Sequence, residues 1–153
     1  ALDAARQDLE QESLRFVRLD KLSAYVPTHI RENEQGMELY AKTIEQLEEV
    51  QQSLAKIYAI DDEKKFDVKK KLTSAFRRIA PDGVATSIGW SCNFRALRHV
   101  IEMRTAPDAE EELRLVFGKV YEIVKDRYPS LMGDYEVEIA DGLPWVRTKH
   151  KKV

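Results

Sequence analysis

Arginines beside small polar residues are the side chains of this sequence with the most distinctive chemistry. A guanidinium offers a planar fork of donors that matches phosphate oxygens, and amides at a helix N-terminus add partial positive charge. The pattern predicts phosphate binding, although an individual arginine is more often solvated or part of a surface ion pair. The groups are Ser13 with Arg15, Arg77 before a proline turn, Asn93 with Arg95, and Arg104 at the end of the same segment.

Motifs for several other chemistries are absent from the sequence. No Gly-x-Ser-x-Gly elbow, P-loop, HExxH helix or Gly-x-Gly-x-x-Gly turn occurs. One cysteine, Cys92, and three histidines give neither an internal disulfide nor a zinc-binding spacing. Cys92 has no adjacent base to activate it. We therefore expect no metal ion and no side-chain nucleophile.

Composition limits the class of protein and the class of partner. The 153 residues, 43% of them hydrophobic, are enough for one sizeable core, so we expect a single domain over 1–153. Twenty-five Lys and Arg against 27 Asp and Glu give no overall attraction to nucleic acid or to an anionic membrane. No apolar run approaches the ~20 residues that span a bilayer. Together with the single cysteine, this predicts a cytoplasmic protein without nucleic-acid or membrane partners.

The elements that must position these arginines begin with a long helix. Apolar residues recur at steps of three and four over 34–58, and their nearly 3.5-residue period suits packing against another helix or a second subunit. A second helical pattern opens at Asp61 and Asp62 and ends at a turn over 80–83. An N-terminal strand is predicted over 13–19.

The second half of the chain predicts a strand, two helices and a hairpin. A short strand within 86–92 leads to Asn93, a good N-cap for a helix over 94–104. Asp108 with Glu111 forms a capping-box pattern for a helix that runs to Pro129. Alternating residues around Asp141 and Gly142 predict a terminal β-hairpin. The fold class is helix-rich α+β with a small, mostly antiparallel sheet.

Four segments in order resemble the flavin-dependent thymidylate synthases, also called thymidylate synthase complementing proteins. The stretch from Trp90 to Arg104 is similar to that family's W-T-x-N-x-R-x-L segment and its later arginine. Residues 77–81 resemble the end of A-R-x-x-L-P, residues 10–16 resemble E-x-S-x-R-[YF], and residues 109–114 resemble A-x-W-E-I-R. The segments span roughly residues 10 to 130.

The resemblance implies a homotetrameric FAD enzyme that methylates dUMP to dTMP. Methylenetetrahydrofolate would supply the carbon, and NADPH would supply the hydride through the flavin. By the same resemblance, dUMP is held by Ser13, Arg15, Arg77 and Arg104, with Arg104 also the candidate catalytic residue. FAD is held by Asn93 and Arg95, with His99 beside it. The flavin would then carry the redox chemistry, which accounts for the missing nucleophile motif.

The sequence departs from the family pattern at one diagnostic element. At the spacing from Ser13 where the family has R-H-R, this chain has Asp3-Ala4-Ala5. We expect the R-H-R motif and part of the N-terminal flavin-binding region to lie on residues that precede Asp8 in a longer chain. Two alternatives stay open: a non-catalytic nucleotide-binding relative without the flavin motif, and a helical interaction protein whose matches are due to chance.

Overall fold

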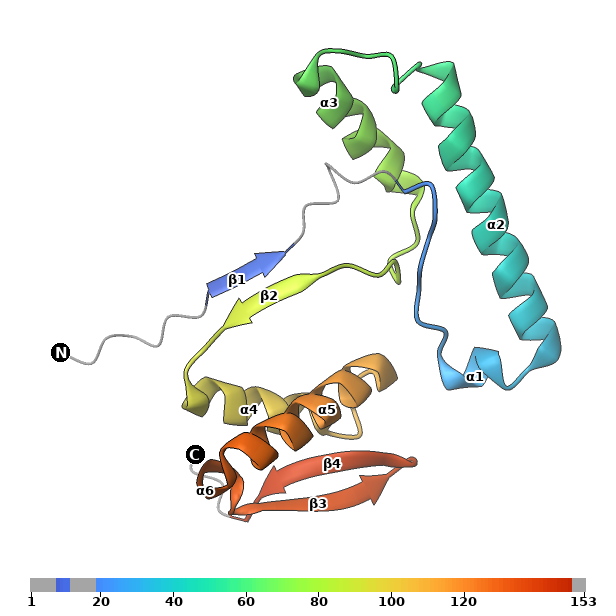
Figure 1. Ribbon diagram of the computed structural model, residues 1–153. Coiled ribbons are helices and arrows are strands. Elements are labelled where there is room, and N and C mark those ends of the chain that lie inside the picture. Colours follow the sequence, from blue (N-terminus) through green and yellow to red (C-terminus); the bar gives the residue numbers. More distant parts are fainter. Residues whose placement is uncertain (1–7, 12–18, 150–153) are drawn as a thin grey trace. The chain divides into compact units, whose positions relative to one another are not determined.

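The structure is a computed structural model. Most of the residues that it describes are helical. The described residues are 8–11 and 19–149, and the chain divides into two units, Glu10–Gly89 and Ala1–Leu9 with Trp90–Val153 (Figure 1). The elements confirm the predicted α+β class with a small antiparallel component. The single domain over 1–153 stays a prediction, and the units are described one at a time.

The unit Glu10–Gly89 is built on the long helix α2, Glu34–Ile57, which confirms the helix predicted over 34–58. Asn33 caps it by accepting a hydrogen bond from the backbone amide of Gly36 at 2.8 Å. A short helix α1, Thr28–Arg31, precedes α2. An isolated antiparallel bridge joins Ala24 to Val84.

The next helix, α3, spans Phe66–Phe76 and passes into the 3₁₀ helix η1, Arg77–Ile79. The predicted start at Asp61 and Asp62 is wrong. Residue Ala59 has a φ of 45°, which ends α2 in the left-handed conformation that follows many helices. The chain then turns to bury Ile60 beside Ala55 and Phe76, so α3 cannot begin until the turn is complete.

Two short strands carry residues of both units. Strand β1, Asp8–Gln11, forms a two-stranded sheet with β2, Ile88–Ser91, and the boundaries between the units fall within these strands. Strand β2 confirms the strand predicted within 86–92. The strand predicted over 13–19 lies outside the described residues, apart from Leu19.

The second unit contains α4, Phe94–Thr105, and α5, Glu111–Arg127. Asn93 caps α4 as predicted, with its side chain accepting from the amide of Ala96 at 2.8 Å. The capping box at Asp108 is wrong, because Glu110 is the N-cap of α5 and no side chain caps that helix. The amide of Ala109 donates to the carbonyl of Ala106 at 3.0 Å, which closes a turn and moves the helix start past Asp108.

A hairpin completes this unit after the short helix α6, Pro129–Met132. Strand β3, Tyr135–Ala140, pairs antiparallel with β4, Leu143–Thr148. The turn residues Asp141 and Gly142 have φ of 52° and 76°, the left-handed pair that a type I′ turn requires. The predicted hairpin is therefore confirmed at its predicted turn.

Helices α4 and α5 pack on the same hairpin, around a core that includes Ile101, Tyr121 and Val146 (Figure 1). The approach of α5 to β4 is close at Gly118. A Cβ atom added there would lie 2.9 Å from Cγ of Pro144, inside normal contact distance. Glycine at 118 thus allows the helix to lie directly on the strand.

Candidate functional site

An open groove of about 1710 Å³ runs beside α4. Its walls come from α4, the loop between α4 and α5, the corner before β3, and the end of β4. Three of the candidate site residues, Arg95, His99 and Arg104, line it, together with Asp108, which the sequence singled out as a helix cap. The structure thus brings the candidate flavin-binding arginine and the candidate catalytic arginine to one groove.

Arg95 and Arg104 give this groove two guanidinium groups that could bind an anion. Neither side chain has a hydrogen bond or ion pair to another described residue, and both side chains are exposed. Nine residues of α-helix separate them, which corresponds to about 13.5 Å along the axis and half a turn around it. The two arginines therefore face different parts of the groove.

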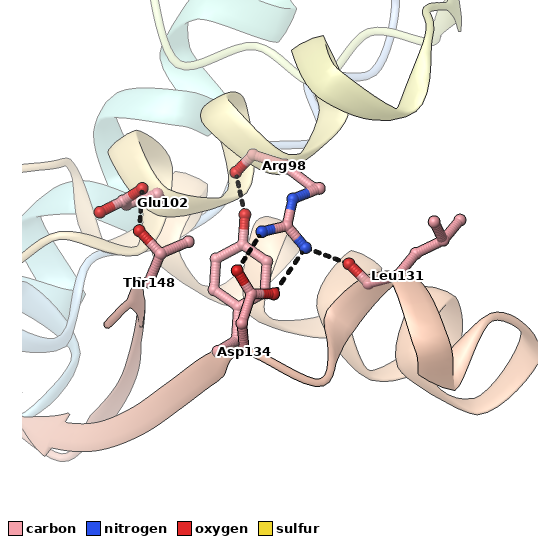
Figure 2. Close-up of polar contacts among 6 residues, drawn as sticks. Arg98, Glu102, Leu131, Asp134 and Thr148 are labelled. Atoms are coloured by element: carbon pink, nitrogen blue, oxygen red, sulfur yellow. Dashed lines mark hydrogen bonds and ion pairs between the residues drawn. The ribbon is translucent and has the colours of Figure 1, made fainter. Parts of the chain in front are cut away.

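The remaining arginine of α4 in this groove, Arg98, is fully engaged by the protein (Figure 2). Its guanidinium donates to both carboxylate oxygens of Asp134, at 2.9 and 2.7 Å, and to the carbonyl of Leu131. The hydrogen bond to Asp134 raises the pKa of Arg98 above its usual value. Such a bidentate pair fixes geometry on both partners, so Arg98 ties α4 to the corner before β3.

Tyr135 adds a second tie between the same elements. Its hydroxyl donates to the carbonyl of Arg98 at 2.8 Å, and the Arg98 guanidinium lies 4.5 Å from the centre of its ring. Burial raises the pKa of Tyr135 to about 12, so the phenol remains protonated and keeps donating at neutral pH. Protein contacts hold this wall of the groove, whereas the side chains of Arg95, His99 and Arg104 have no such contact with another described residue.

Further along α4, Glu102 makes a long contact with β4. Its carboxylate accepts from the Thr148 hydroxyl at 3.5 Å (Figure 2). The other carboxylate oxygen of Glu102 is buried without a hydrogen-bond partner among the described residues. One lining carboxylate thus remains incompletely satisfied beside the arginines.

Strand β4 supplies groove residues that the sequence did not single out. Trp145 and Arg147 lie two apart on one face of the strand, with the guanidinium 5.0 Å from the centre of the indole ring. Arg147 also pairs with Glu138, and Lys149 pairs with Glu136 at 3.0 Å. The alternation that predicted the hairpin also places Trp145 and Arg147 together, and this signal could have identified the pair.

Asn93 is not among the residues that line the groove. It lies one residue before α4, and its side-chain oxygen is engaged with the amide of Ala96. Its carboxamide nitrogen is the group left for a ligand. The structure thus confirms the predicted role of Asn93 as the N-cap of α4. Its role in binding FAD stays a prediction.

Arg77 belongs to the other unit. It is exposed, begins η1, and lines a cavity of about 10 Å³ together with Gln51, Leu19 and Asp20. Ser13 and Arg15 lie outside the described residues. Leu19 and Asp20, which line the same cavity, stand four and five residues after Arg15 in the sequence.

Burial raises the pKa of the Cys92 thiol, which disfavours the thiolate. No cluster of three or more His, Cys, Asp or Glu suited to a metal ion occurs in residues 8–11 and 19–149. Within the same residues, no helix has both the length and the apolar character needed to cross a bilayer.

Comparison with protein families decides the relationship. The family model described as thymidylate synthase complementing protein matches residues 5–130. The chain belongs to this family. Membership confirms the resemblance drawn from four separate segments, and it overturns the alternative that those matches are due to chance.

Relatives of the thymidylate synthase complementing family agree with this assignment. The flavin-dependent thymidylate synthase of Corynebacterium diphtheriae is 31% identical over 139 residues, which cover 86% of this chain and 54% of that protein. The protein of the same name from Corynebacterium glutamicum is 31% identical over 137 residues, and that from Haloarcula marismortui is 31% identical over 108. The chain spans about half the length of the first of these relatives.

Proposed function

We propose that this chain carries out flavin-dependent thymidylate synthesis, the reductive methylation of dUMP to dTMP. The observation that carries the proposal is that Arg95 and Arg104 lie on α4 in one groove of a family member, both without a partner among the described residues. Methylenetetrahydrofolate would supply the carbon, and NADPH the reducing equivalents. FAD would supply the redox chemistry, and the chain would supply position and charge.

The residues present fit a flavin dinucleotide. The groove is larger than the ~300–1,000 Å³ of many small-molecule pockets, and an unpaired guanidinium lies near the N-terminus of a capped helix. Arg95 would donate to a phosphate, His99 lies one turn further along α4, and the Asn93 carboxamide nitrogen would donate at the helix start. Neither Arg95 nor His99 has to be released from a protein contact before it binds a ligand, because neither side chain has a partner among the described residues.

For dUMP, the proposal assigns Ser13, Arg15, Arg77 and Arg104. Arg104 would contact the nucleotide near its base and is the proposed catalytic residue. Its position half a turn around α4 from Arg95 supports separate ligands for the two arginines. Leu19 and Asp20 beside Arg77 support a common nucleotide-binding role for Arg77 and the preceding Ser13 segment.

We expect Arg95→Ala to weaken FAD binding by about ten- to a hundred-fold, because it removes a charge-assisted donor worth ~1.5–3 kcal/mol. Affinity for dUMP should stay within about twofold, since Arg95 serves the other ligand. Flavin fluorescence quenching measures the first effect, and calorimetry measures the second. Arg127→Ala, at the exposed end of α5, is the matched control and should change neither.

Fluorescence quenching that does not saturate up to high micromolar FAD would contradict the proposed flavin-dependent activity. If dUMP still bound, the result would favour the second candidate, a nucleotide-binding relative without flavin. The Asp3-Ala4-Ala5 sequence, in place of R-H-R, is the observation that keeps this candidate open.

We also propose a homotetramer with α2 at an interface. Leu39, Val50 and Ile57 are exposed, Ile57 by 74%, and their spacing places them within about 20° of one line on the helix. An exposed apolar line on a long helix is typical of an interaction surface. The family resemblance supports a second copy as its partner.

Light scattering should therefore return four times the 17.7 kDa chain mass at micromolar concentration. We expect Val50→Glu with Ile57→Glu to reduce that mass, because burying two carboxylates in the interface is unfavourable. Gln52→Glu, on the opposite side of α2, should leave the mass unchanged. A monomer for the unaltered chain would contradict the proposal.

A further inference from the structure

Gln51 is a buried polar side chain of the unit Glu10–Gly89. It is 4% exposed and lies on α2 one turn before Ala55, which packs with Phe76 at the end of α3. Its side-chain amide donates to the carbonyl of Phe76 at 2.9 Å. Burial of an amide is unfavourable unless it is hydrogen-bonded, so this contact accounts for how Gln51 is accommodated.

The acceptor of this hydrogen bond lies at a junction. Phe76 is the last residue of α3, and Arg77 is the first residue of η1. The last carbonyls of an α-helix lack their regular intrahelical donors, so a side chain that donates there fixes where the helix ends. Gln51 and Arg77 also line the same small cavity.

We infer that Gln51 is a positioning residue for Arg77 in nucleotide binding, an inference that rests on the proposed function. The bond from α2 fixes the peptide from which the Arg77 side chain begins. A guanidinium fork binds phosphate through two directed hydrogen bonds, so a small rotation at its origin misplaces both donors.

Apolar packing alone would hold α3 on α2 without fixing this rotation. Ala55, Ile60 and Phe76 form the buried cluster, with Leu72 packed against it. These contacts are non-directional. The hydrogen bond from Gln51 is directed at the single carbonyl before Arg77, which distinguishes positioning from packing.

The test uses Gln51→Met, which keeps the side-chain length and removes the donor. Gln51→Leu, which is apolar and also lacks a donor, serves as a second variant should the first not fold. Gln52→Met places the same substitution on the neighbouring exposed glutamine and is the matched control. Circular dichroism establishes folding, calorimetry measures dUMP affinity, and flavin quenching measures FAD affinity.

We expect Gln51→Met to weaken dUMP binding by roughly tenfold, with FAD affinity and the Gln52→Met control within about twofold of the unaltered chain. In an Arg77→Ala background, Gln51→Met should cause no further loss of dUMP affinity, because the residue acts through Arg77. A role in stability alone would lower the melting temperature in both backgrounds and leave the dUMP affinity of the folded protein unchanged.

Unchanged dUMP affinity in folded Gln51→Met or, should that variant not fold, in folded Gln51→Leu would overturn the inference alone. An equal loss with and without Arg77 would also overturn it, because Gln51 would then act by another route. Absence of dUMP binding by the unaltered chain would overturn the proposed function and the inference with it.

Discussion

Arg114→Ala is expected to lower the free energy of unfolding by about 2–4 kcal/mol, through lost hydrogen bonds and a cavity. The guanidinium is 4% exposed and donates to the carbonyl of Ala140 and to Asp141, the latter at 3.3 Å. These contacts hold the hairpin turn on α5. Urea unfolding of the folded chain measures the effect.

Arg127→Ala, exposed at the end of the same helix, should change the free energy by less than about 0.5 kcal/mol. Arg114→Met separates the two causes, because it fills most of the space but cannot donate. A loss below about 1 kcal/mol in Arg114→Ala would show that the cost of burying the charge cancels its contacts.

Arg77→Ala is expected to weaken dUMP binding by about ten- to a hundred-fold, or ~1.5–3 kcal/mol. The exposed guanidinium beginning η1 is available to a phosphate, and the proposed function assigns it to the nucleotide. Arg77→Lys should also lose affinity, since an ammonium group is a point charge and cannot replace a planar fork. Calorimetry of dUMP binding measures both variants.

Arg78 provides the control for this experiment. It follows Arg77 in η1 and is also exposed, so Arg78→Ala removes the same charge from the same short helix. Equal losses in the two alanine variants would indicate a general charge effect. Unchanged affinity in Arg77→Ala would remove Arg77 from the nucleotide site.

The elements with strong local signals were predictable from the sequence. The periodic apolar residues of α2, the Asn93 cap and the Asp141-Gly142 turn all depend on neighbouring residues in the chain. The two incorrect helix starts have one cause. In each case a turn precedes the helix and moves its start beyond the acidic residues that favoured it. The left-handed Ala59 makes this turn before α3, and the hydrogen bond from the Ala109 amide makes it before α5.

The candidate site was only partly predictable. Arg95, His99 and Arg104 were identified from a family motif, and the structure places them along one groove. Arg98 lies within the same motif, but its role depends on Asp134 and Tyr135, more than 30 residues later. Gln51 gives no local signal, because its importance comes from a carbonyl 25 residues away. Such contacts are set by packing rather than by local sequence.

The close approach of Gly118 to Pro144 also bears on how relatives of this chain could diverge. An alanine at 118 would collide with the rigid proline ring, so that change is disfavoured while the ring is present. Loss of the ring at 144 removes the collision and makes the larger residue acceptable. The two positions should therefore covary, with the change at 144 arising first and the change at 118 following it.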